Sequence, residues 1–292
     1  MRTSQNLVYI VLNYNSGPST VECVKNIQKV TNSLSRIIVI DNHSTDDSML
    51  FLQRIEENNV EIIQASRNGG YAAGNNIGLR RAQELGAEFA IIMNPDVSIT
   101  EDIGSKLRHY MVNNQTCGIV APALESQNED TNYGEIIHLG RIHFEEKVYS
   151  TDNQPVVDID SIVGACFMVR LSVIEVVGYI SEDYFLNFEE TEWCLKIKHA
   201  GFNVVCVPSC RAFHVGEEAI NKVSGMQVYF LRRNLVLFNK RMINGFQFAF
   251  FLSKIFLLAT AQCLKHWSFI PFLSYLDGLT ERNRLLEEKK LY

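Results

Sequence analysis

Three carboxylates crowd into four residues at the start of a predicted helix: Glu189, Glu190 and Glu192. A helix N-terminus stabilises an anion by roughly 0.3–1 kcal/mol, so ordinary first-turn decoration is one explanation. The preceding segment, Tyr184-Phe185-Leu186-Asn187-Phe188, is strongly apolar and favours another. Apolar neighbours would remove water from a carboxylate and raise its pKa toward that of a useful general base.

Asp96 and His214 are the candidate ligands for a cation. Asp96 follows a short apolar strand and the turn-forming Pro95, so its carboxylate would project from the rigid edge of a sheet. Mg²⁺ and Mn²⁺ prefer oxygen ligands, and diphosphate oxygens and water can complete the octahedron around one or two protein groups. His214 could add a nitrogen, which suits Mn²⁺ better than Mg²⁺. The alternative for His214 is a satisfied core side chain beside Phe213.

Loops rich in glycine and short polar side chains follow the predicted strands. They span residues 13–16, 41–46, 67–71 and 94–97. Asn, Asp, Ser and Gly also simply form turns, so any one loop says little. Four such loops in series suit a nucleotide, whose base, ribose and phosphates must each meet separate donors and acceptors.

The elements that would position these loops alternate between strands and helices. Short β-branched runs predict strands at 7–13, 36–41, 60–64, 89–94 and 118–121. Helical patterns fill 20–30, 48–58, 73–85 and 102–113. This alternation predicts an α/β fold with a mostly parallel sheet flanked by helices. In such sheets ligands collect at the carboxyl ends of the strands, where the polar loops lie.

The second half of the chain is less regular. Residues 133–161 break into short acidic pieces that suit antiparallel pairing and an acceptor-binding role. A helix over 189–200, ended by Gly201, and a strand over 203–207 follow. The last 70 residues form a helical extension. We therefore predict a nucleotide-binding half at about 1–122, an acceptor half at about 123–220, and a basic helical region over 221–292.

Missing motifs argue against several enzyme classes. A dinucleotide-binding fold needs G-x-G-x-x-G after the first strand, where this chain reads Asn-Tyr-Asn-Ser-Gly-Pro. Neither a P-loop nor a G-x-S-x-G nucleophile elbow occurs. NAD-dependent redox chemistry, nucleotide hydrolysis and serine hydrolysis are therefore disfavoured. The seven cysteines form no C-x-x-C pair, which fits a reducing cytosol better than a zinc or redox site.

Charge is divided unevenly along the chain. Residues 1–220 hold 16 Lys and Arg against 29 Asp and Glu, whereas residues 221–292 hold 11 against 4. The overall charge of −6 argues against a nucleic-acid partner. The first apolar run, 7–12, is too short for a signal peptide and lacks a small-residue cleavage site, so we expect a cytoplasmic protein.

The basic region contains the longest apolar stretch, 246–264. A lysine near its centre would cost about 2.5–3.5 kcal/mol in a membrane-spanning helix, which disfavours spanning. If this region is one continuous helix, five residues at helical spacing form a narrow stripe beside a wide apolar face: Lys240, Gln247, Lys254, Ala261 and Lys265. Such a helix suits the headgroup region of an anionic membrane. A core-packing helix or a homodimer contact is the alternative.

Together these segments resemble the inverting family-2 glycosyltransferases of the GT-A fold, especially the bacterial rhamnosyltransferase-like branch that builds surface polysaccharides. The resemblance covers about residues 7–240 and implies a GT-A glycosyltransferase domain over 1–220. Seven blocks in the family's order carry it: VLNYN (11–15), IDNHSTD (40–46), NGGYAAGNN (68–76), MNPDV (93–97), GAC (164–166), FEETE (188–192) and FH (213–214).

The resemblance implies which residues bind a nucleotide. Asp41 would accept a hydrogen bond from a pyrimidine base. The loop after the first strand would line the nucleotide, and later positions would hold the ribose or the diphosphate. The implied nucleotide-binding residues are Asn13, Tyr14, Asn15, Asp41, Asn68, Gly69, Asn75 and Asp96.

The resemblance also implies a metal site and a base. Asp96 matches the last acid of the family's DxD motif, whose first acid is replaced by Asn94, and His214 matches the distal metal-binding histidine. With one protein carboxylate, Mn²⁺ or Mg²⁺ would arrive with the diphosphate, so strict metal dependence is not implied. Glu190, with Glu189 beside it, matches the position of the base that takes the proton of the acceptor hydroxyl.

The implied reaction is a single displacement with inversion. The donor would be a UDP- or dTDP-sugar, and the acceptor a saccharide or a lipid-linked saccharide at the inner face of the cell membrane. Two other interpretations stay open. A sugar-nucleotide nucleotidyltransferase would carry a Gly-rich, basic loop after the first strand, where this chain has Asn-Tyr-Asn-Ser. A non-catalytic nucleotide-sugar-binding protein would be favoured by loss of Asp96 or of the glutamate pair, and both are present.

Overall fold

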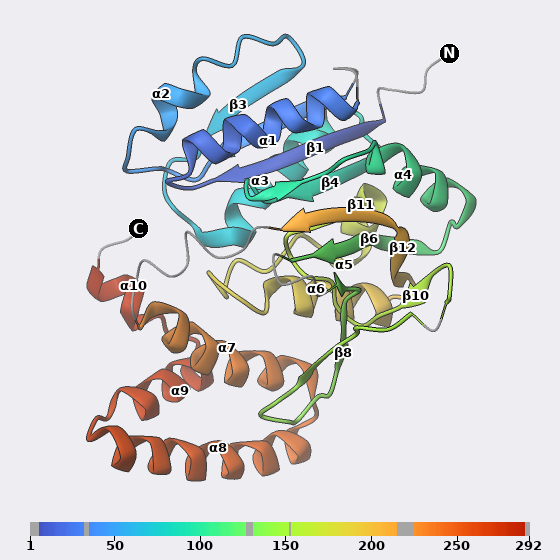
Figure 1. The fold of residues 1–292 in the computed structure, drawn as a ribbon. Helices are drawn as coiled ribbons and strands as arrows, with labels where there is room; N and C mark the ends of the chain where they lie inside the picture. The colour runs from blue at the N-terminus through green and yellow to red at the C-terminus, as the bar shows by residue number, and fades with distance from the viewer. Residues whose placement is uncertain (1–5, 32–34, 127–130, 152, 215–224, 290–292) are drawn as a thin grey trace.

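The computed structural model describes residues 6–31, 35–126, 131–151, 153–214 and 225–289 (Figure 1). Its strands are β1 (Leu7–Asn13), β2 (Arg36–Asp41), β3 (Val60–Gln64), β4 (Phe89–Met93), β5 (Val97–Ser98), β6 (Cys117–Glu125), β7 (Thr131–Asn132), β10 (Val157–Asp158), β11 (Cys166–Arg170) and β12 (Asn203–His214). They form one sheet in the order β10-β12-β6-β11-β4-β1-β2-β3, with β5 paired to β12 and β7 to β6. A separate hairpin joins β8 (Glu135–Ile137) and β9 (Glu145–Lys147).

The strands that matter for the site run in one direction. β1 pairs in parallel with β2 and β4, β2 with β3, and β6 with β12. β11 runs antiparallel between β4 and β6, so β4 and β6 still point the same way. The carboxyl ends of these strands therefore meet at one edge. The predicted α/β fold with a mostly parallel sheet is confirmed.

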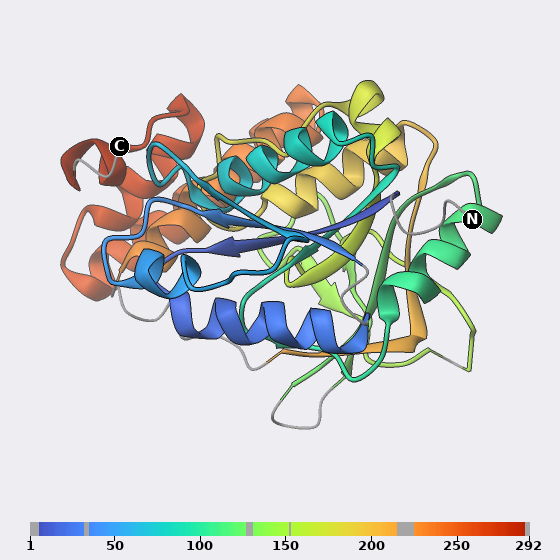
Figure 2. The same ribbon diagram turned by 90° about the horizontal axis from the view of Figure 1, so that it is seen from above.

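Helices cover both faces of the sheet, as Figure 2 shows. Helices α1 (Gly17–Val30) and α4 (Ile103–Asn113) pack on one face through side chains such as Ile27 and Leu107. Helices α3 (Gly70–Glu84) and α6 (Glu189–His199) pack on the other through Leu79 and Trp193. Shorter turns are α2 (Ser48–Leu52), η1 (Leu171–Val173) and α5 (Ile174–Val177).

Two predicted elements have different lengths in the structure. The helix predicted over 48–58 ends at Leu52, because bonds from Arg54 to Phe51 and from Ile55 to Leu52 tighten the chain before it enters β3. The strand predicted over 203–207 continues to His214 as β12. Pro208 cannot donate to a strand partner, and the register with β6 shifts between Val207 and Arg211, so the chain bulges around the proline and resumes pairing.

The C-terminal helices lie together beside the sheet domain (Figure 1). They are α7 (Met226–Met242), α8 (Gly245–His266), α9 (Ile270–Thr280) and α10 (Arg284–Lys289). Helices α7, α8 and α9 share one hydrophobic core with the segment before α6, in which Phe238 of α7 packs against Phe188 at 5.4 Å between ring centroids. The expected boundary between residues 220 and 221 lies outside the described residues.

The expectation of one continuous stripe from Lys240 to Lys265 is wrong. Lys240 lies on α7, which ends at Met242, and forms an ion pair with Glu281 at 2.7 Å. Asn244 then starts a new helix by accepting a hydrogen bond from the backbone N–H of Gln247. The Asn244-Gly245 pair was the sequence signal for this break.

Helix α8 presents much of its apolar surface to solvent. Within the described chain it is the single helix long and apolar enough to cross a membrane by length and composition, and 17% of its apolar window is buried. Its buried stripe is Phe251, Ile255 and Ala259, which pack in the core shared with α7 and α9. At its two ends Phe246 and Trp267 are 88% and 95% exposed.

Candidate active site

The ends of β1 and β2 form a closed network of hydrogen bonds. Asn13 and Asp41 are fully buried, and Asn13 Nδ2 donates to Asp41 Oδ1 at 2.8 Å. Asn13 Oδ1 accepts from the Thr20 hydroxyl at 2.7 Å. The Ser44 hydroxyl donates to Asp41 Oδ1 at 2.5 Å, and Gln64 Nε2 donates to Asp41 Oδ2 at 3.4 Å. Asp41 therefore holds the loop after β2 in place, and its contact with a pyrimidine base stays a prediction.

The loop after β1 is tied to the loop after β2. Asn15 has a left-handed backbone, with φ of 52°, and its side-chain Oδ1 accepts from the backbone N–H of Thr45 at 2.8 Å. The backbone N–H of Asn15 donates to the Ser44 hydroxyl at 2.9 Å. These bonds leave Tyr14 half-buried between them. The structure thus brings Asn13, Tyr14 and Asn15 to the same edge as Asp41.

The start of α3 approaches this edge from the face of the sheet opposite to α1. Asn42 Nδ2 donates to Asn68 Oδ1 and to the carbonyl of Gly70, each at 3.0 Å. A side chain at Gly69 would meet Ala73 Cβ at 2.5 Å, so the turn requires glycine. Asn75 is fully buried one turn into the helix, and its Oδ1 has no hydrogen-bond partner within the described residues.

Asp96 and His214 lie together although 118 positions separate them in the chain. β12 pairs with β5 so that His214 is opposite Val97, the neighbour of Asp96. His214 Nε2 is 3.2 Å from Asp96 Oδ2, and both side chains are about a quarter to a third exposed. The extension of β12 beyond the predicted end at Val207 is what carries His214 to this place.

The residues present fit a divalent cation of the kind the sequence implied. Asp96 Oδ1 is buried without a hydrogen-bond partner in the part of the chain that is described. A carboxylate oxygen that is free of other bonds can accept a metal ion. One carboxylate and one imidazole are a donor set that suits Mn²⁺. No cluster of three or more His, Cys, Asp or Glu side chains occurs among the described residues, so the remaining ligands would be diphosphate and water.

At the N-terminus of α6, Glu189 is buried and Glu190 is half-buried. Glu189 is 2% exposed, and burial together with repulsion from Glu190 raises its pKa well above the ordinary value. Burial raises the pKa of Glu190 to about 7. One carboxylate oxygen of each is buried with no partner among the residues described here. Burial thus shifts both pKa values in the expected direction, whereas the share of segment 184–188 in this effect stays a prediction.

Gly164 and Tyr71 form the wall beside Glu190. A side chain at Gly164 would come within 2.7 Å of Glu190 Oε1, so glycine makes room for the carboxylate. The Tyr71 hydroxyl donates to the carbonyl of Gly164 at 2.5 Å. Burial and the nearby Glu190 raise the pKa of Tyr71, which therefore keeps its proton. Both residues lie in blocks that carry the family resemblance, but no role was predicted for either, because their contact joins positions 93 apart.

One short segment connects the cation site to the carboxylate pair. The backbone N–H of Asn94 donates to the carbonyl of Ala165 at 2.8 Å, and Asn94 is two residues before Asp96. Gly164, the neighbour of Ala165, contacts Glu190. Asp96, His214 and Glu190 therefore belong to one continuous region of the molecule. Glu192 does not: it points away, toward Lys196 at 2.8 Å and Arg241 at 3.6 Å.

Comparisons with known proteins agree on one family. The sequence model of the family described as Glycosyl transferase family 2 matches residues 9–178. The dTDP-rhamnosyl transferase RfbF of Shigella flexneri is 27% identical over 230 residues, which are 77% of this chain and 74% of RfbF. The low-salt glycan biosynthesis hexosyltransferase Agl10 of Haloferax volcanii is 27% identical over 247 residues, 80% of this chain and 75% of Agl10.

A solved structure is similar in fold. The mannosyltransferase PcManGT from Pyrobaculum calidifontis, in complex with GDP-Man and Mn²⁺, matches with a TM-score of 0.60 and 15% identity. The match covers 97% of this chain and 89% of that protein. At this identity the similarity concerns the fold alone.

Proposed function

The chain belongs to glycosyl transferase family 2, and on this premise we propose that it moves a sugar from a nucleoside-diphosphate donor to an acceptor hydroxyl in one displacement with inversion. The predicted family and the GT-A type of fold are confirmed, and the chain is a glycosyltransferase. The observation that carries the proposal is the half-buried carboxylate of Glu190, whose pKa is raised to about 7 and which is connected through Gly164 and Ala165 to the region of Asp96.

The donor would lie along the edge where β1, β2 and β4 end. Asn13, Tyr14 and Asn15 would face the nucleotide, and Asp41 would order the loop around the base. Asn68, Gly69 and the amide oxygen of Asn75, which has no partner in the described part of the chain, would meet the donor at the start of α3. The relation to RfbF makes a dTDP-deoxyhexose the first donor to test, with UDP-sugars next.

Asp96 and His214 would hold a divalent cation, Mn²⁺ or Mg²⁺, at the diphosphate. Bound there, the cation would offset the negative charge that grows on the leaving diphosphate. Replacing Asp96 by alanine removes the carboxylate whose Oδ1 has no hydrogen-bond partner among the described residues. We expect nucleotide diphosphate binding in Mn²⁺ to weaken at least tenfold, as measured by calorimetry, and Ser98→Ala on the neighbouring strand β5 to leave it unchanged.

Glu190 would take the proton from the attacking acceptor hydroxyl. Of the two glutamates it is the more accessible, since Glu189 is 2% exposed and Glu190 is half-buried. A base must be deprotonated to act, so kcat should rise with pH through about 7 and then level off. Glu189, whose pKa is raised well above the ordinary value, would keep its proton beside the base.

Glu190→Gln tests this assignment. The amide keeps the shape of the side chain but cannot accept the proton, so kcat should fall about 100-fold or more while nucleotide affinity is kept. Glu175→Gln, an exposed glutamate on α5, is the matched control and should behave as the wild type. Wild-type turnover by Glu190→Gln would remove Glu190 from the mechanism.

Incubation with donors in the absence of acceptor separates the enzyme classes. Slow release of nucleoside diphosphate is the expected result for a glycosyltransferase. Release of pyrophosphate from a sugar phosphate and a nucleoside triphosphate would identify a nucleotidyltransferase instead. Absence of any turnover across dTDP-, UDP- and GDP-sugars would favour a non-catalytic nucleotide-sugar-binding protein.

We also propose that α8 and α9 lie on an anionic membrane surface, where a lipid-linked saccharide acceptor would be presented. Phe246 and Trp267 expose aromatic rings at both ends of α8, and Phe250 and Leu257 between them are 63% and 70% exposed. Aromatic and aliphatic side chains beside basic ones are typical of helices that bind the headgroup region. The surplus of basic residues after position 220 would add attraction to anionic lipid.

Co-sedimentation with vesicles containing phosphatidylglycerol tests the membrane proposal. The double change Phe246→Ser and Trp267→Ser should lower binding at least tenfold, because each aromatic side chain contributes about 2 kcal/mol when it leaves water. Val176→Ser removes an apolar side chain that is 62% exposed on α5 and should have no effect. Unchanged binding would refute the proposal, and loss of a dimer in sedimentation velocity would assign the face to a second copy of the chain.

A further inference from the structure

The five residues before α6 have an unusual backbone. Phe185, Asn187 and Phe188 have φ of 66°, 66° and 78°, in the left-handed region that side chains other than glycine rarely occupy. Phe188 is the N-cap of α6 and directly precedes Glu189 and Glu190. Such a conformation persists only where surrounding structure holds it. The orientation of the carboxylate pair therefore depends on whatever holds residues 184–188.

A single side chain of α7 holds this loop. Asn234 is fully buried, and its Nδ2 lies 3.1 Å from the carbonyl oxygen of Tyr184, 2.7 Å from that of Leu186 and 3.0 Å from that of Asn187. The two N–H bonds of the amide are thus shared among three carbonyls of the strained turn. Asn234 Oδ1 accepts from Arg233 Nη1 at 2.6 Å, which fixes the orientation of the amide.

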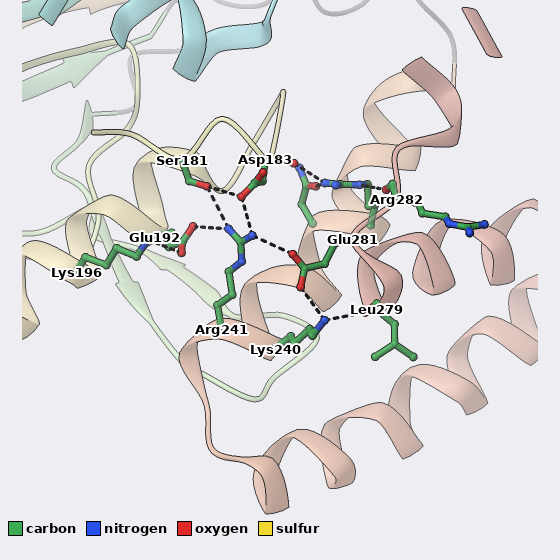
Figure 3. Close-up of polar contacts among 11 residues, drawn as sticks. Ser181, Asp183, Glu192, Lys196, Lys240, Arg241, Leu279, Glu281 and Arg282 are labelled. Carbon is green, nitrogen blue, oxygen red and sulfur yellow. Dashed lines mark hydrogen bonds and ion pairs between the residues drawn. The ribbon is translucent and has the colours of Figure 1, made fainter. Parts of the chain in front are cut away.

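Two arginines of α7 extend the attachment to the residues just before the loop. Arg233 Nη1 donates to the carbonyl of Asp183 at 2.9 Å. Arg241 Nη2 donates to the Asp183 carboxylate at 2.7 Å, and Arg241 Nη1 lies 3.6 Å from Glu192 in the first turn of α6 (Figure 3). Glu281, at the end of α9, joins the same cluster through Arg241 and Lys240. The C-terminal helices are therefore bonded to both ends of the loop.

The loop also touches the donor side of the site. The carbonyl of Phe185 accepts from the backbone N–H of Tyr71 at 3.1 Å. A side chain at Gly70 would collide with the same carbonyl. Since Tyr71 also bonds to Gly164 beside Glu190, a shift of the loop would move the base and its wall together.

We propose that Asn234 is a positioning residue for Glu190, and that α7 is for this reason part of the catalytic apparatus rather than an appended helix. The inference rests on the proposed role of Glu190 as the base. Asn234 acts through the loop 184–188: it keeps the left-handed turn closed, and the closed turn keeps Glu190 dry and aimed at the acceptor.

Asn234→Ala tests the proposal in the full-length enzyme. We expect kcat to fall about 100-fold, since displacing a catalytic group by about 1 Å has effects of that size, while the KM for the donor changes less than about threefold. Water admitted to the opened loop should lower the pKa of Glu190, so the rising limb of the pH profile of kcat should move from about 7 toward the ordinary range of a glutamate.

Asn239→Ala is the matched control. Asn239 is equally buried on the same helix, but it bonds to the backbone N–H of Gly140 and to the carbonyl of Leu235 instead of to the loop. The Asn239→Ala variant should lose about as much thermal stability as Asn234→Ala. The rising limb of its pH profile of kcat should stay where it is in the wild type. A merely structural role for Asn234 would make the two variants alike in pH profile, and that result would overturn the proposal.

Two further variants keep the test decisive. Asn234→Asp keeps the shape but cannot donate to the carbonyls, and should reproduce the loss of kcat. If neither variant of Asn234 folds, Arg241→Gln at the more exposed end of α7 takes its place. It should lower kcat by about tenfold and shift the rising limb of the pH profile in the same direction. A rising limb that does not move would count against the proposal. Glu190→Gln is measured in parallel. If it is as active as the wild type, the base assignment fails, whereas an inactive Glu190→Gln beside a fully active Asn234→Ala refutes the positioning role alone.

Discussion

The donor edge and the start of α6 handle buried polar groups in opposite ways. At the donor edge, the carboxylate of Asp41 receives hydrogen bonds from Asn13, Ser44 and Gln64. At the start of α6, Glu189 and Glu190 each bury an oxygen that has no partner among the described residues. A satisfied polar network makes a fold rigid, whereas an unsatisfied carboxylate destabilises it and becomes more basic. The difference suits a binding surface on one side and a proton acceptor on the other.

The two regions also differ in what supports their backbone. The donor loops contain left-handed Asn15 and His43, and neighbouring side chains of the same two loops hold them. The loop before α6 contains left-handed Phe185 and Phe188, and a helix some 50 positions later in the chain holds it through Asn234. The first region is therefore held by bonds between its own two loops, 29 and 30 positions apart in the chain, and the second by a helix outside the sheet domain.

Gly70 lies where the two regions touch, and changing it should have the largest effect. It has φ of 84°, and an added Cβ would collide with Phe185, so Gly70→Ala should lower the free energy of unfolding by about 3 kcal/mol in urea titrations. Gly86→Ala is the control for the backbone cost alone, because Gly86 has φ of 73° with open space around it. It should lose only about 1 kcal/mol. Equal losses would mean that the two regions are not in close contact.

Removing a partner from the satisfied network should come next in size. Asn13→Ala deletes two donated bonds and one accepted bond around a buried carboxylate, so we expect a loss of about 2 kcal/mol in the free energy of unfolding. Asn113→Ala, on the exposed end of α4, should change it by less than about 0.5 kcal/mol. A loss at Asn13 no larger than this control would show that the network is not preorganised.

Removing the buried carboxylate of Glu189 at the start of α6 should have the opposite effect and raise the free energy of unfolding. The pKa of Glu189 is raised in the folded state, so the folded protein holds the proton more tightly than the unfolded chain and stability falls as pH rises above about 4.5. Glu189→Gln cannot ionise and should be about 1 kcal/mol more stable than the wild type at pH 8, with the gain disappearing near pH 4.5. Thermal unfolding across this range measures it. Destabilisation at every pH would show that Glu189 is partnered after all.

The comparison explains which predictions succeeded. Strands β1, β2 and β3 match their predicted bounds, because each is a short β-branched run that ends in a polar turn. The role of each site residue is a different matter: the fold brings Asp96 next to His214, but their chemistry stays a prediction until variants are measured.

Other features depend on contacts between distant parts of the chain. The extension of β12 past Pro208 depends on a bulge against β6. The division of one expected stripe between α7 and α8 was signalled by Asn244-Gly245, yet the ion pair that removes Lys240 from the stripe is made with Glu281 on a distant segment.

What the sequence determined by itself is whatever depends on neighbours in the chain: hydrophobic periodicity, turn residues, the acidic cluster of α6 and the blocks that identify the family. Tertiary structure alone decided how Glu190 loses its water, how His214 reaches Asp96, and that Asn234 supports a loop it never meets in sequence. The physical reason is that desolvation and long-range hydrogen bonds depend on which surfaces pack together, and that is settled only when the whole core forms.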